Sequence, residues 1–287
     1  MFLHVFEDVL KYFYFNVKEK CIICQEQDKT KLLTFLETDW AYHAYAIADL
    51  SEPFFSQCQW WATEDELGIV SLVLLFMGLN PPILFTMGTD IHIADILNRM
   101  ELPERVMLLG SENHIPIILT YYQPDYLDSM FRMVLTADNF CPVYHTPSKR
   151  SGSILLDEHY LSDLEQLYKN DTGNSFVAYQ LRQGVFYGIF NNEVLISAAG
   201  THIISNDYRI AAIGNITTHP DHRKHGYAQQ VTSAVCHDLL MQKFRLVLNV
   251  RQNNRPAIHM YKKLGFHVHA PFFEGIATLQ GKVRSFP

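Results

Sequence analysis

The feature that most restricts the fold is an ordered series of two strands and two helices late in the chain. The series is expected at residues 208–217 (strand), 223–242 (helix), 245–250 (strand) and 257–264 (helix). The first helix carries Ala228, Val231 and Val235 along one face, and the second strand is almost wholly apolar. Because a helix crosses between them, the two strands should lie parallel in one sheet.

The segments around this series contain two short helices and further strands with the pattern of antiparallel hairpins. For the helices, apolar residues recur at helical spacing in residues 158–168, and a second short helix is expected at residues 176–181. Further strands are expected at residues 185–190, 194–204, 267–270 and 274–279. Hairpins followed by strand–helix–strand predict an α+β fold with a mixed, mostly antiparallel sheet.

The first half of the chain has a different pattern. Two prolines, a glycine, serines and basic residues give residues 141–152 the composition of a linker. We therefore expect two domains, residues 1–145 with α/β character and residues 146–287. In the first domain, helices are expected at residues 1–15, 29–37 and 91–100, and strands at residues 69–76, 83–85 and 115–121. The uncharged stretch of residues 67–85 contains two adjacent prolines, which would break a membrane-spanning helix.

Charge and cysteine content argue against two other classes of protein. A net charge of −7 does not suit a nucleic-acid binder, which needs a basic surface to neutralise phosphates. Five cysteines, an odd number, do not make a disulfide framework, so a reducing, cytoplasmic setting is expected. Cys21 and Cys24 form a CxxC pair without a second pair, and we interpret them as strand residues rather than zinc ligands or a redox centre.

The first motif with chemical meaning opens the helix expected at residues 223–242. Arg223, Gly226 and Ala228 form R-x-x-G-x-A where a strand gives way to a helix. Small residues let an anion approach the backbone, and the first amide groups of a helix have no acceptor within it. A diphosphate is the natural ligand, with Arg223 or Lys224 close enough to add positive charge. Alone, the pattern is common at helix starts.

The second motif is Asn254-x-x-Ala257-x-x-x-Tyr261-x-x-x-Gly265-Phe266, in the last predicted helix. Ala257 and Tyr261 share one face of that helix, and Asn254 can cap its start. Each position also has an ordinary structural interpretation, as a cap, a core tyrosine and a terminating glycine.

In order and separation, the two motifs resemble those of the GNAT superfamily of acyl-CoA-dependent N-acyltransferases. The family pairs R/Q-x-x-G-x-G/A with a downstream N-x-x-A-x-x-x-Y-x-x-x-G-F, which residues 223–228 and 254–266 match. The resemblance spans about residues 149–279, and residues 214–220 are similar to the Gly-Asn-x-x-Thr-His-Pro signature of a two-domain group. Residues 1–140 contain neither motif, and their pattern could be a degenerate copy of the same fold, as in tandem relatives.

The resemblance implies a GNAT fold whose central parallel strands splay apart around coenzyme A, with acetyl-CoA as the expected acyl donor. The implied cofactor residues are Ile216, Thr217 and Thr218 for the pantetheine arm, Arg223, Lys224, His225, Gly226, Tyr227 and Ala228 for the pyrophosphate, and Asn254 beside the pantetheine. Tyr261 would lie by the thioester sulfur and give a proton or hydrogen bond to the leaving thiolate.

The expected reaction is direct attack of a neutral amine on the thioester, with a backbone N–H of the strand at residues 208–217 stabilising the oxyanion. A base must take a proton from the amine. Many relatives have a glutamate on this strand, whereas residues 209–218 contain none. His202 on the preceding strand is the best substitute because its unperturbed pKa is near neutrality, although it could be an ordinary core or surface histidine. Glu274 and His219 are weaker alternatives.

The main prediction is an acetyltransferase that acts on a small-molecule amine or an amino acid, with neither nucleic acid nor a membrane as partner. His219, His222 and His225 could suggest a metal site, but we expect none because the first two lie in a turn and the loop amides are assigned to phosphate. The first domain is expected to shape the acceptor pocket or an interface, and a homodimer stays open. The alternative is a noncatalytic acyl-CoA-binding sensor that has lost its base.

Overall fold

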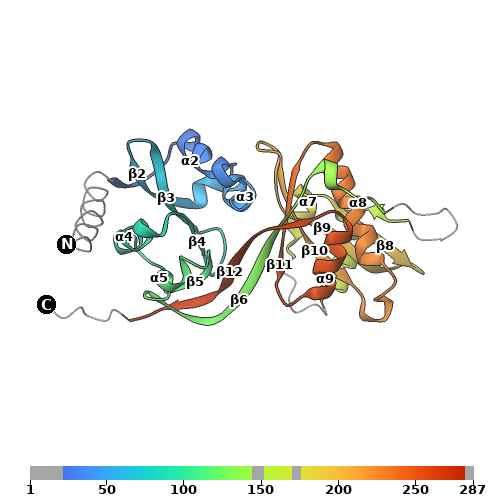
Figure 1. The fold of residues 1–287 in the computed structure, drawn as a ribbon. Coiled ribbons are helices and arrows are strands. Elements are labelled where there is room, and N and C mark those ends of the chain that lie inside the picture. Colours follow the sequence, from blue (N-terminus) through green and yellow to red (C-terminus); the bar gives the residue numbers. More distant parts are fainter. Residues whose placement is uncertain (1–21, 144–151, 170–175, 282–287) are drawn as a thin grey trace, which may run out of the picture. The chain divides into compact units, whose positions relative to one another are not determined.

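The computed structural model describes residues 22–143, 152–169 and 176–281, and the chain divides into two compact units. Unit 1 comprises Met1–Thr38, Glu52–Asp128 and Phe273–Pro287, and unit 2 comprises Asp39–Ser51 and Ser129–Phe272. The units therefore interleave along the chain, whereas the sequence pattern suggests one boundary after residue 145. The physical reason is that two long strands, β6 (Tyr122–Leu135) and β12 (His267–Leu279), each contribute residues to both units (Figure 1).

Unit 1 is a mostly antiparallel sheet with short helices. Its strands are β1 (Ile22–Gln25), β2 (Cys58–Asp65), β3 (Gly68–Phe76), β4 (Ile83–Gly88) and β5 (Arg105–Gly110), followed in the sheet by β12. Its helices are α2 (Lys29–Leu36), α4 (Ile93–Arg99) and α5 (Ile115–Ile118). The only parallel pair in the described part of this unit is β4 with β5, and α4 crosses between those two strands. The helices expected at residues 29–37 and 91–100 are confirmed.

The strand expected at residues 115–121 is wrong, because this segment forms α5 and a turn. A short apolar run cannot be assigned by periodicity alone, since a buried helical turn and a buried strand look alike. The residue that decides is Pro116, which lies in the first turn of α5, where a missing N–H costs nothing.

Unit 2 has the larger sheet. Its strands, in sheet order, are β12, β6, β11 (Arg245–Arg251), β10 (Ile210–Thr218), β9 (Val194–Ser205), β8 (Phe186–Asn191) and β7 (Ile154–Leu155). Its helices are α3 (Ala44–Ala48), α6 (Leu161–Tyr168), α7 (Ala178–Gln183), α8 (Tyr227–Met241) and α9 (Arg255–Lys263). The parallel pairing expected for the strands on either side of the long helix is confirmed, because β10 and β11 run parallel. Their antiparallel neighbours make the sheet mixed, as predicted.

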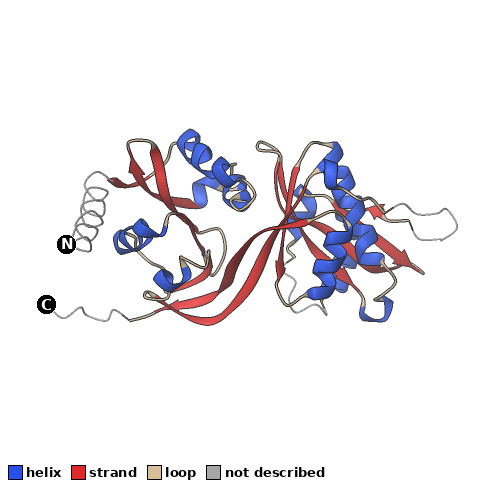
Figure 2. Cartoon of the chain, viewed as in Figure 1, coloured by secondary structure: helices blue, strands red, loops and turns tan. Residues whose placement is uncertain are grey.

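Alternation along the central strands separates the two faces of this sheet. Ala211 and Ile213 of β10 belong to the core cluster formed with Val231, Val235 and Leu239 of α8, so they face that helix. Figure 2 shows helices of this unit packed against its strands. Intervening strand residues point to the opposite face. There, α6 packs with β8 and β9 in a separate cluster, and α3 and α7 also contact this part of the sheet.

Two other strand expectations needed correction. The short strands expected at residues 267–270 and 274–279 are one continuous strand, β12, which passes through the exposed Pro271. A proline is tolerated in a strand where its missing N–H would not pair. β6 has no counterpart in the sequence analysis, because Pro124, Asp125 and Asp128 interrupt its apolar pattern. The helix expected at residues 1–15 lies outside the described residues. Within the described part of the chain, every helix is too short or too polar to cross a bilayer.

Candidate active site

The centre of unit 2 opens where β10 and β11 part. Ile210 to Ile213 pair with Arg245 to Leu248, and the described pairing between the two strands ends there. β10 continues to Thr218, while the rest of β11 pairs on its other side with β6. The expected splay between the parallel strands is confirmed, and it leaves one edge of β10 beyond Ile213 without a sheet partner among the described residues.

A bulge shapes this part of β10. Gly214 lies opposite Gly200 and Thr217 opposite Ala198, so Asn215 and Ile216 stand against the single residue between those partners. Asn215 has a left-handed backbone with φ of 51°. An extra residue of this kind bends the strand and turns its backbone groups, which is why bulges are common beside active sites.

Backbone directions differ among the three residues expected to meet the pantetheine arm. The Thr217 carbonyl accepts a hydrogen bond from Ser197 Oγ at 3.2 Å, and the N–H of His219 donates to the Ile196 carbonyl at 2.8 Å. These groups face β9, so strand alternation turns the backbone of Ile216 and Thr218 toward the gap. The Thr218 carbonyl also accepts from Arg223 Nε at 3.1 Å, which holds the arginine against the end of β10.

The loop before α8 has backbone features typical of an anion-binding loop, and residues 223–228 are named the anion cradle. Lys224 and Gly226 have φ of 66° and 82°, and α8 begins at Tyr227, later than the helix start expected at residue 223 because these left-handed residues cannot belong to a helix. The first amides of α8 have no acceptor within the helix, and left-handed residues in a turn gather amides into a concavity. A Cβ at Gly226 would meet nothing within 4 Å, so the space beside its Cα is open. Backbone of this kind at a helix start is typical of sites that hold a phosphate or diphosphate.

The other predicted cradle residues lie around this opening. Arg223, Lys224 and His225 are exposed, while Tyr227 and Ala228 are half-buried at the start of α8. The His225 ring stacks on Tyr227, with their centroids 5.8 Å apart. Asn254 lies at the start of α9, where its Oδ1 accepts from the Ala257 N–H at 3.2 Å. Asn254 therefore caps α9 through its side-chain oxygen, as the ordinary structural interpretation of this position predicts.

Tyr261 lies on the buried face of α9. Its side chain is 8% exposed and meets Phe266 edge-on, with ring centroids 5.9 Å apart. Burial raises the pKa of its phenol, and the nearby Cys236 raises it further. The phenol is therefore protonated at neutral pH.

His202 is the extra residue of a second bulge, in β9. Ala212 lies opposite Ile203 and Ile213 opposite Thr201, so His202 is the residue added between two successive pairs of the ladder. Its Cβ lies against Gly214, where an added Cβ would approach within 2.8 Å. Burial lowers the pKa of its imidazole below the ordinary value, so the ring is neutral at pH 7 and able to accept a proton.

A segment that local sequence patterns did not indicate, Asp39–Ser51, comes from the first half of the chain but belongs to unit 2. The Tyr45 and His202 rings meet edge-on, with their centroids 6.2 Å apart. The guanidinium of the buried Arg132 lies over the face of the Tyr45 ring, 4.6 Å from its centroid. Ser51 Oγ lies 2.8 Å from Ser205 Oγ at the end of β9. Nothing in the local pattern of residues 39–51 indicates this position, because the contacts are all with residues far away in sequence.

Two further polar groups on this side were also missed. Asn249 Oδ1 on β11 is buried and has no hydrogen-bond partner among the described residues. Asp49, at the end of α3, has a pKa raised to about 8 by desolvation. His219, expected as a weaker base, lies at the end of β10 with Nδ1 accepting from the Asp221 N–H at 3.4 Å. Glu274, the other weak candidate, belongs to unit 1.

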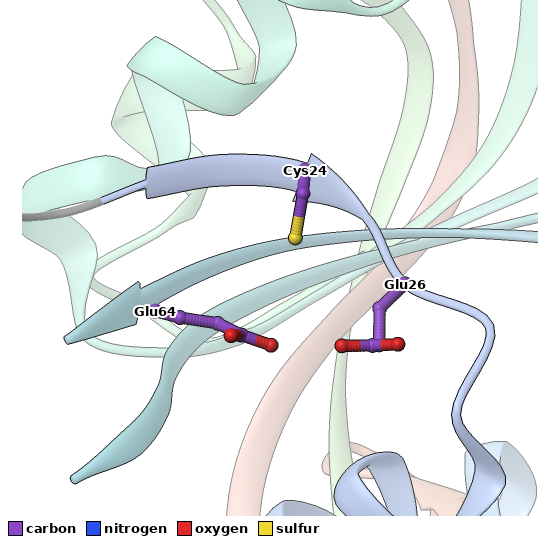
Figure 3. A group of neighbouring side chains, drawn as sticks. All are labelled: Cys24, Glu26 and Glu64. Atoms are coloured by element: carbon purple, nitrogen blue, oxygen red, sulfur yellow. The ribbon is translucent and has the colours of Figure 1, made fainter. Parts of the chain in front are cut away.

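In the described ranges, one group of side chains has atoms close enough for a metal ion, and it lies in unit 1. Figure 3 shows Cys24, Glu26 and Glu64 with their ligand atoms turned toward one another, all within 4.8 Å. Lys31 Nζ lies 3.3 Å from Glu26 and 3.2 Å from Glu64, so an ammonium group already pairs with both carboxylates and offsets part of their negative charge. The three histidines at 219, 222 and 225 form no such group.

Comparison with known proteins supports this geometry. Residues 186–272 match the family model described as FR47-like protein. No curated protein matches the chain. These 186–272 bounds take in β8 to β11, both motifs and the start of β12, so the family match coincides with the candidate site.

Solved structures match over nearly the whole chain. A Drosophila protein is 14% identical over 90% of this chain and 98% of its own, with a TM-score of 0.65. A GCN5-related N-acetyltransferase-like protein from Streptococcus suis is 13% identical over 88% and 99%, with a TM-score of 0.58. A tandem GNAT protein from the clavulanic acid biosynthesis pathway is 11% identical over 92% and 99%, also with a TM-score of 0.58. At these identities the likeness establishes the fold alone: the chain has the two-domain fold of these GNAT proteins, and residues 186–272 match the FR47-like family model.

Proposed function

We propose that this protein is an N-acetyltransferase that moves an acetyl or other short acyl group from coenzyme A to an amine. The fold is one found among acetyltransferases. We infer from it an acyl-coenzyme A donor, an amine acceptor and the residues that bind and react with them. The observation that carries it is the opening of the sheet beyond Ile213, directly before the anion cradle at Gly226. A free strand edge that leads to a helix start suits a ligand with an amide-bearing arm and a diphosphate.

The residues divide the work of holding coenzyme A. Backbone groups of Ile216 and Thr218 face the gap and would hydrogen-bond the pantetheine amides, with Thr217 between them. The amides of residues 224–228 would hold the diphosphate, and Arg223 would add positive charge beside it. Asn254 keeps its amide nitrogen for the arm, because the cap uses only Oδ1. When bound, the thioester supplies an activated acyl group.

Three groups of this chain would serve the transfer itself. His202 is neutral at pH 7 and would take a proton from the attacking ammonium or from a water beside it. A backbone N–H freed from the ladder by the bulge at Asn215 would stabilise the negative charge that develops on the thioester oxygen. Tyr261 holds a proton that it would give to the leaving sulfur.

The acceptor side is built from the face of the sheet that carries α3. Asn249 Oδ1 is a buried acceptor that an amine N–H would satisfy, and Tyr45 lines the same face beside His202. We propose a small-molecule amine or an amino acid as acceptor, with the segment of residues 39–51 shaping its pocket. We also propose a cytoplasmic location and leave a homodimer open.

The deciding experiment combines binding and turnover. Calorimetry should show a complex with coenzyme A, and thiol release should be measured with acetyl-CoA against a panel of amines and amino acids. Tyr261→Phe keeps the ring that packs on Phe266 and removes only the hydroxyl, so it should lower kcat at least 10-fold with little change in coenzyme A affinity. Cys236→Ser, a variant of the buried neighbour of Tyr261, controls for disturbance of the same core. Unchanged turnover in Tyr261→Phe would remove the phenol from the mechanism.

A noncatalytic acyl-CoA sensor is the second candidate, and the lack of any carboxylate on β10 favours it. A sensor would bind coenzyme A with comparable affinity and release no thiol with any acceptor. Absence of coenzyme A binding would exclude both functions.

A further inference from the structure

One buried amide side chain connects the two bulges of the candidate site. Gln180 lies on α7 and is 6% exposed. Its Nε2 donates to the carbonyl of His202 at 2.8 Å, and its Oε1 accepts from Asn215 Nδ2 at 3.1 Å. The first contact is to the extra residue of the β9 bulge and the second is to the extra residue of the β10 bulge.

The same side chain also reaches the start of its own helix. Gln180 Oε1 accepts a second hydrogen bond, from the Val177 N–H at 3.1 Å. Val177 and the adjacent Tyr179 are 46% and 40% exposed, so the start of α7 lies at the surface. A single carboxamide thus ties an exposed helix start to both bulges.

The bulges depend on such contacts because the strand ladder is interrupted at each of them. Asn215 is held further by Nδ2 to the Thr201 carbonyl at 3.3 Å and by Tyr168 Oη, which donates to the Asn215 carbonyl at 2.6 Å. A left-handed residue with a side chain costs about 1–2 kcal/mol, and buried polar groups need partners. These hydrogen bonds hold the backbone of the bulge in place where the strand ladder is interrupted.

We propose that Gln180 is a positioning residue for acyl transfer. It fixes the position of His202 relative to the backbone of β10 at Asn215. This inference rests on the acyltransferase function proposed above. In this role Gln180 needs no contact with coenzyme A or the acceptor. It acts through the carbonyl of one bulge and the side chain of the other.

The chemistry of the contacts explains why a glutamine is needed. The His202 carbonyl requires a donor, whereas the Asn215 amide and the Val177 N–H require an acceptor. A glutamate supplies the acceptor and, when ionised, places a negative charge against the His202 carbonyl. A leucine supplies neither group. The two replacements therefore separate loss of one contact from loss of all three.

The test uses Gln180→Glu and Gln180→Leu, with Gln183→Leu as the control on the exposed face of the same helix. For wild type and variants, kcat, the KM of acetyl-CoA and the KM of the best acceptor are measured from pH 5.5 to 9. We expect kcat to fall at least 10-fold in both Gln180 variants, with coenzyme A affinity within about 3-fold of wild type. In Gln180→Glu, the acidic limb of the kcat profile should move to higher pH, because a carboxylate favours protonated His202. The control should match wild type.

A second measurement does not depend on turnover. The His202 ring signals, assigned in an NMR spectrum by comparison with His202→Gln, should shift in both Gln180 variants and stay in place in Gln183→Leu. Wild-type kcat with unshifted His202 signals would overturn the inference, as would a loss of coenzyme A affinity equal to the loss of kcat. Unfolding of both variants would assign Gln180 to stability and also overturn it. Absence of thiol release in wild type would instead count against the proposed function, before any variant is compared.

Discussion

Left-handed backbone angles mark two corners of the candidate site. φ is 51° at Asn215 in the β10 bulge, and 66° and 82° at Lys224 and Gly226 in the cradle. For a residue with a Cβ such an angle costs about 1–2 kcal/mol, so chains keep it where neighbouring groups compensate. At Asn215 the compensation is the set of hydrogen bonds around the bulge. At Gly226 there is no Cβ and the cost is small.

Gly226→Ala separates backbone strain from ligand space. The new Cβ would touch nothing within 4 Å, so the loss of folding stability should be limited to the strain, about 1–2 kcal/mol. The same Cβ would occupy open space in the anion cradle, where we propose that the diphosphate binds, and coenzyme A affinity should fall at least 10-fold. Titration calorimetry and urea unfolding measure the two effects, with Gly281→Ala as a control in open space. Unchanged affinity would place the diphosphate elsewhere.

Asp49 predicts a pH dependence of stability in unit 2. Its folded pKa is raised to about 8 by desolvation, whereas an unfolded aspartate titrates near about 3.9. Between these values the folded protein binds more protons, so the contribution of Asp49 to stability falls as pH rises from about 4 to about 8. The urea midpoint of Asp49→Asn minus that of wild type should therefore increase as pH rises from 5 to 9. The exposed Asp207→Asn serves as control, and a difference that does not change with pH would contradict the shifted pKa.

At the scale of elements, the bulges of β9 and β10 pack closely against each other because a glycine, Gly214, faces the side chain of His202. Gly214 of β10 lies under the Cβ of His202, and an added methyl would come within 2.8 Å of it. Gly214→Ala should push the strands apart, cost about 1–3 kcal/mol by overcrowding and lower kcat through displacement of His202. Thermal unfolding and steady-state kinetics measure both effects, with the exposed Asn206→Ala in the following turn as control. Full activity in Gly214→Ala would show that His202 need not keep this position.

The strands and helices of unit 2 were largely predictable, whereas the bulges were not. Helical spacing in α8, the apolar run of β11 and the Pro and Gly that bound α9 are local signals. A bulge instead depends on how two strands register, and no local pattern reports which residue lacks a partner. His202 was found as a candidate from its chemistry, but its place in a bulge was not.

The same distinction explains the residues that were missed. Gln180, Asn249 and Tyr45 reach the site from α7, β11 and α3, and each is an ordinary residue type in an ordinary local pattern. Their importance comes from partners far away in sequence. The cofactor loop could be predicted because its amides, glycine and arginine are adjacent in the chain.

For the whole molecule, the interleaved units predict an unequal response to truncation. Phe273 to Thr278 pair with β5 in unit 1, while unit 2 ends at Phe272. Deletion of residues 273–287 should therefore expose the edge of β5 and loosen unit 1, while unit 2 keeps all of its residues. Hydrogen exchange should show loss of protection in β4 and β5 with protection retained in β9 and β10. Uniform loss in both units would mean that they fold as one.

Strand β12 also sets the order in which the chain can fold during synthesis. The strands β1 to β5 leave the ribosome first, but the segment that covers the edge of β5 follows all of residues 129–272. At about 5–20 residues per second, synthesis of those residues takes roughly 7–30 s. Throughout that time β5 presents an unpaired edge, which is a template for pairing with other chains. The first unit to be made is thus the last to be completed, and a chaperone that shields strand edges should matter more for its yield than for that of unit 2.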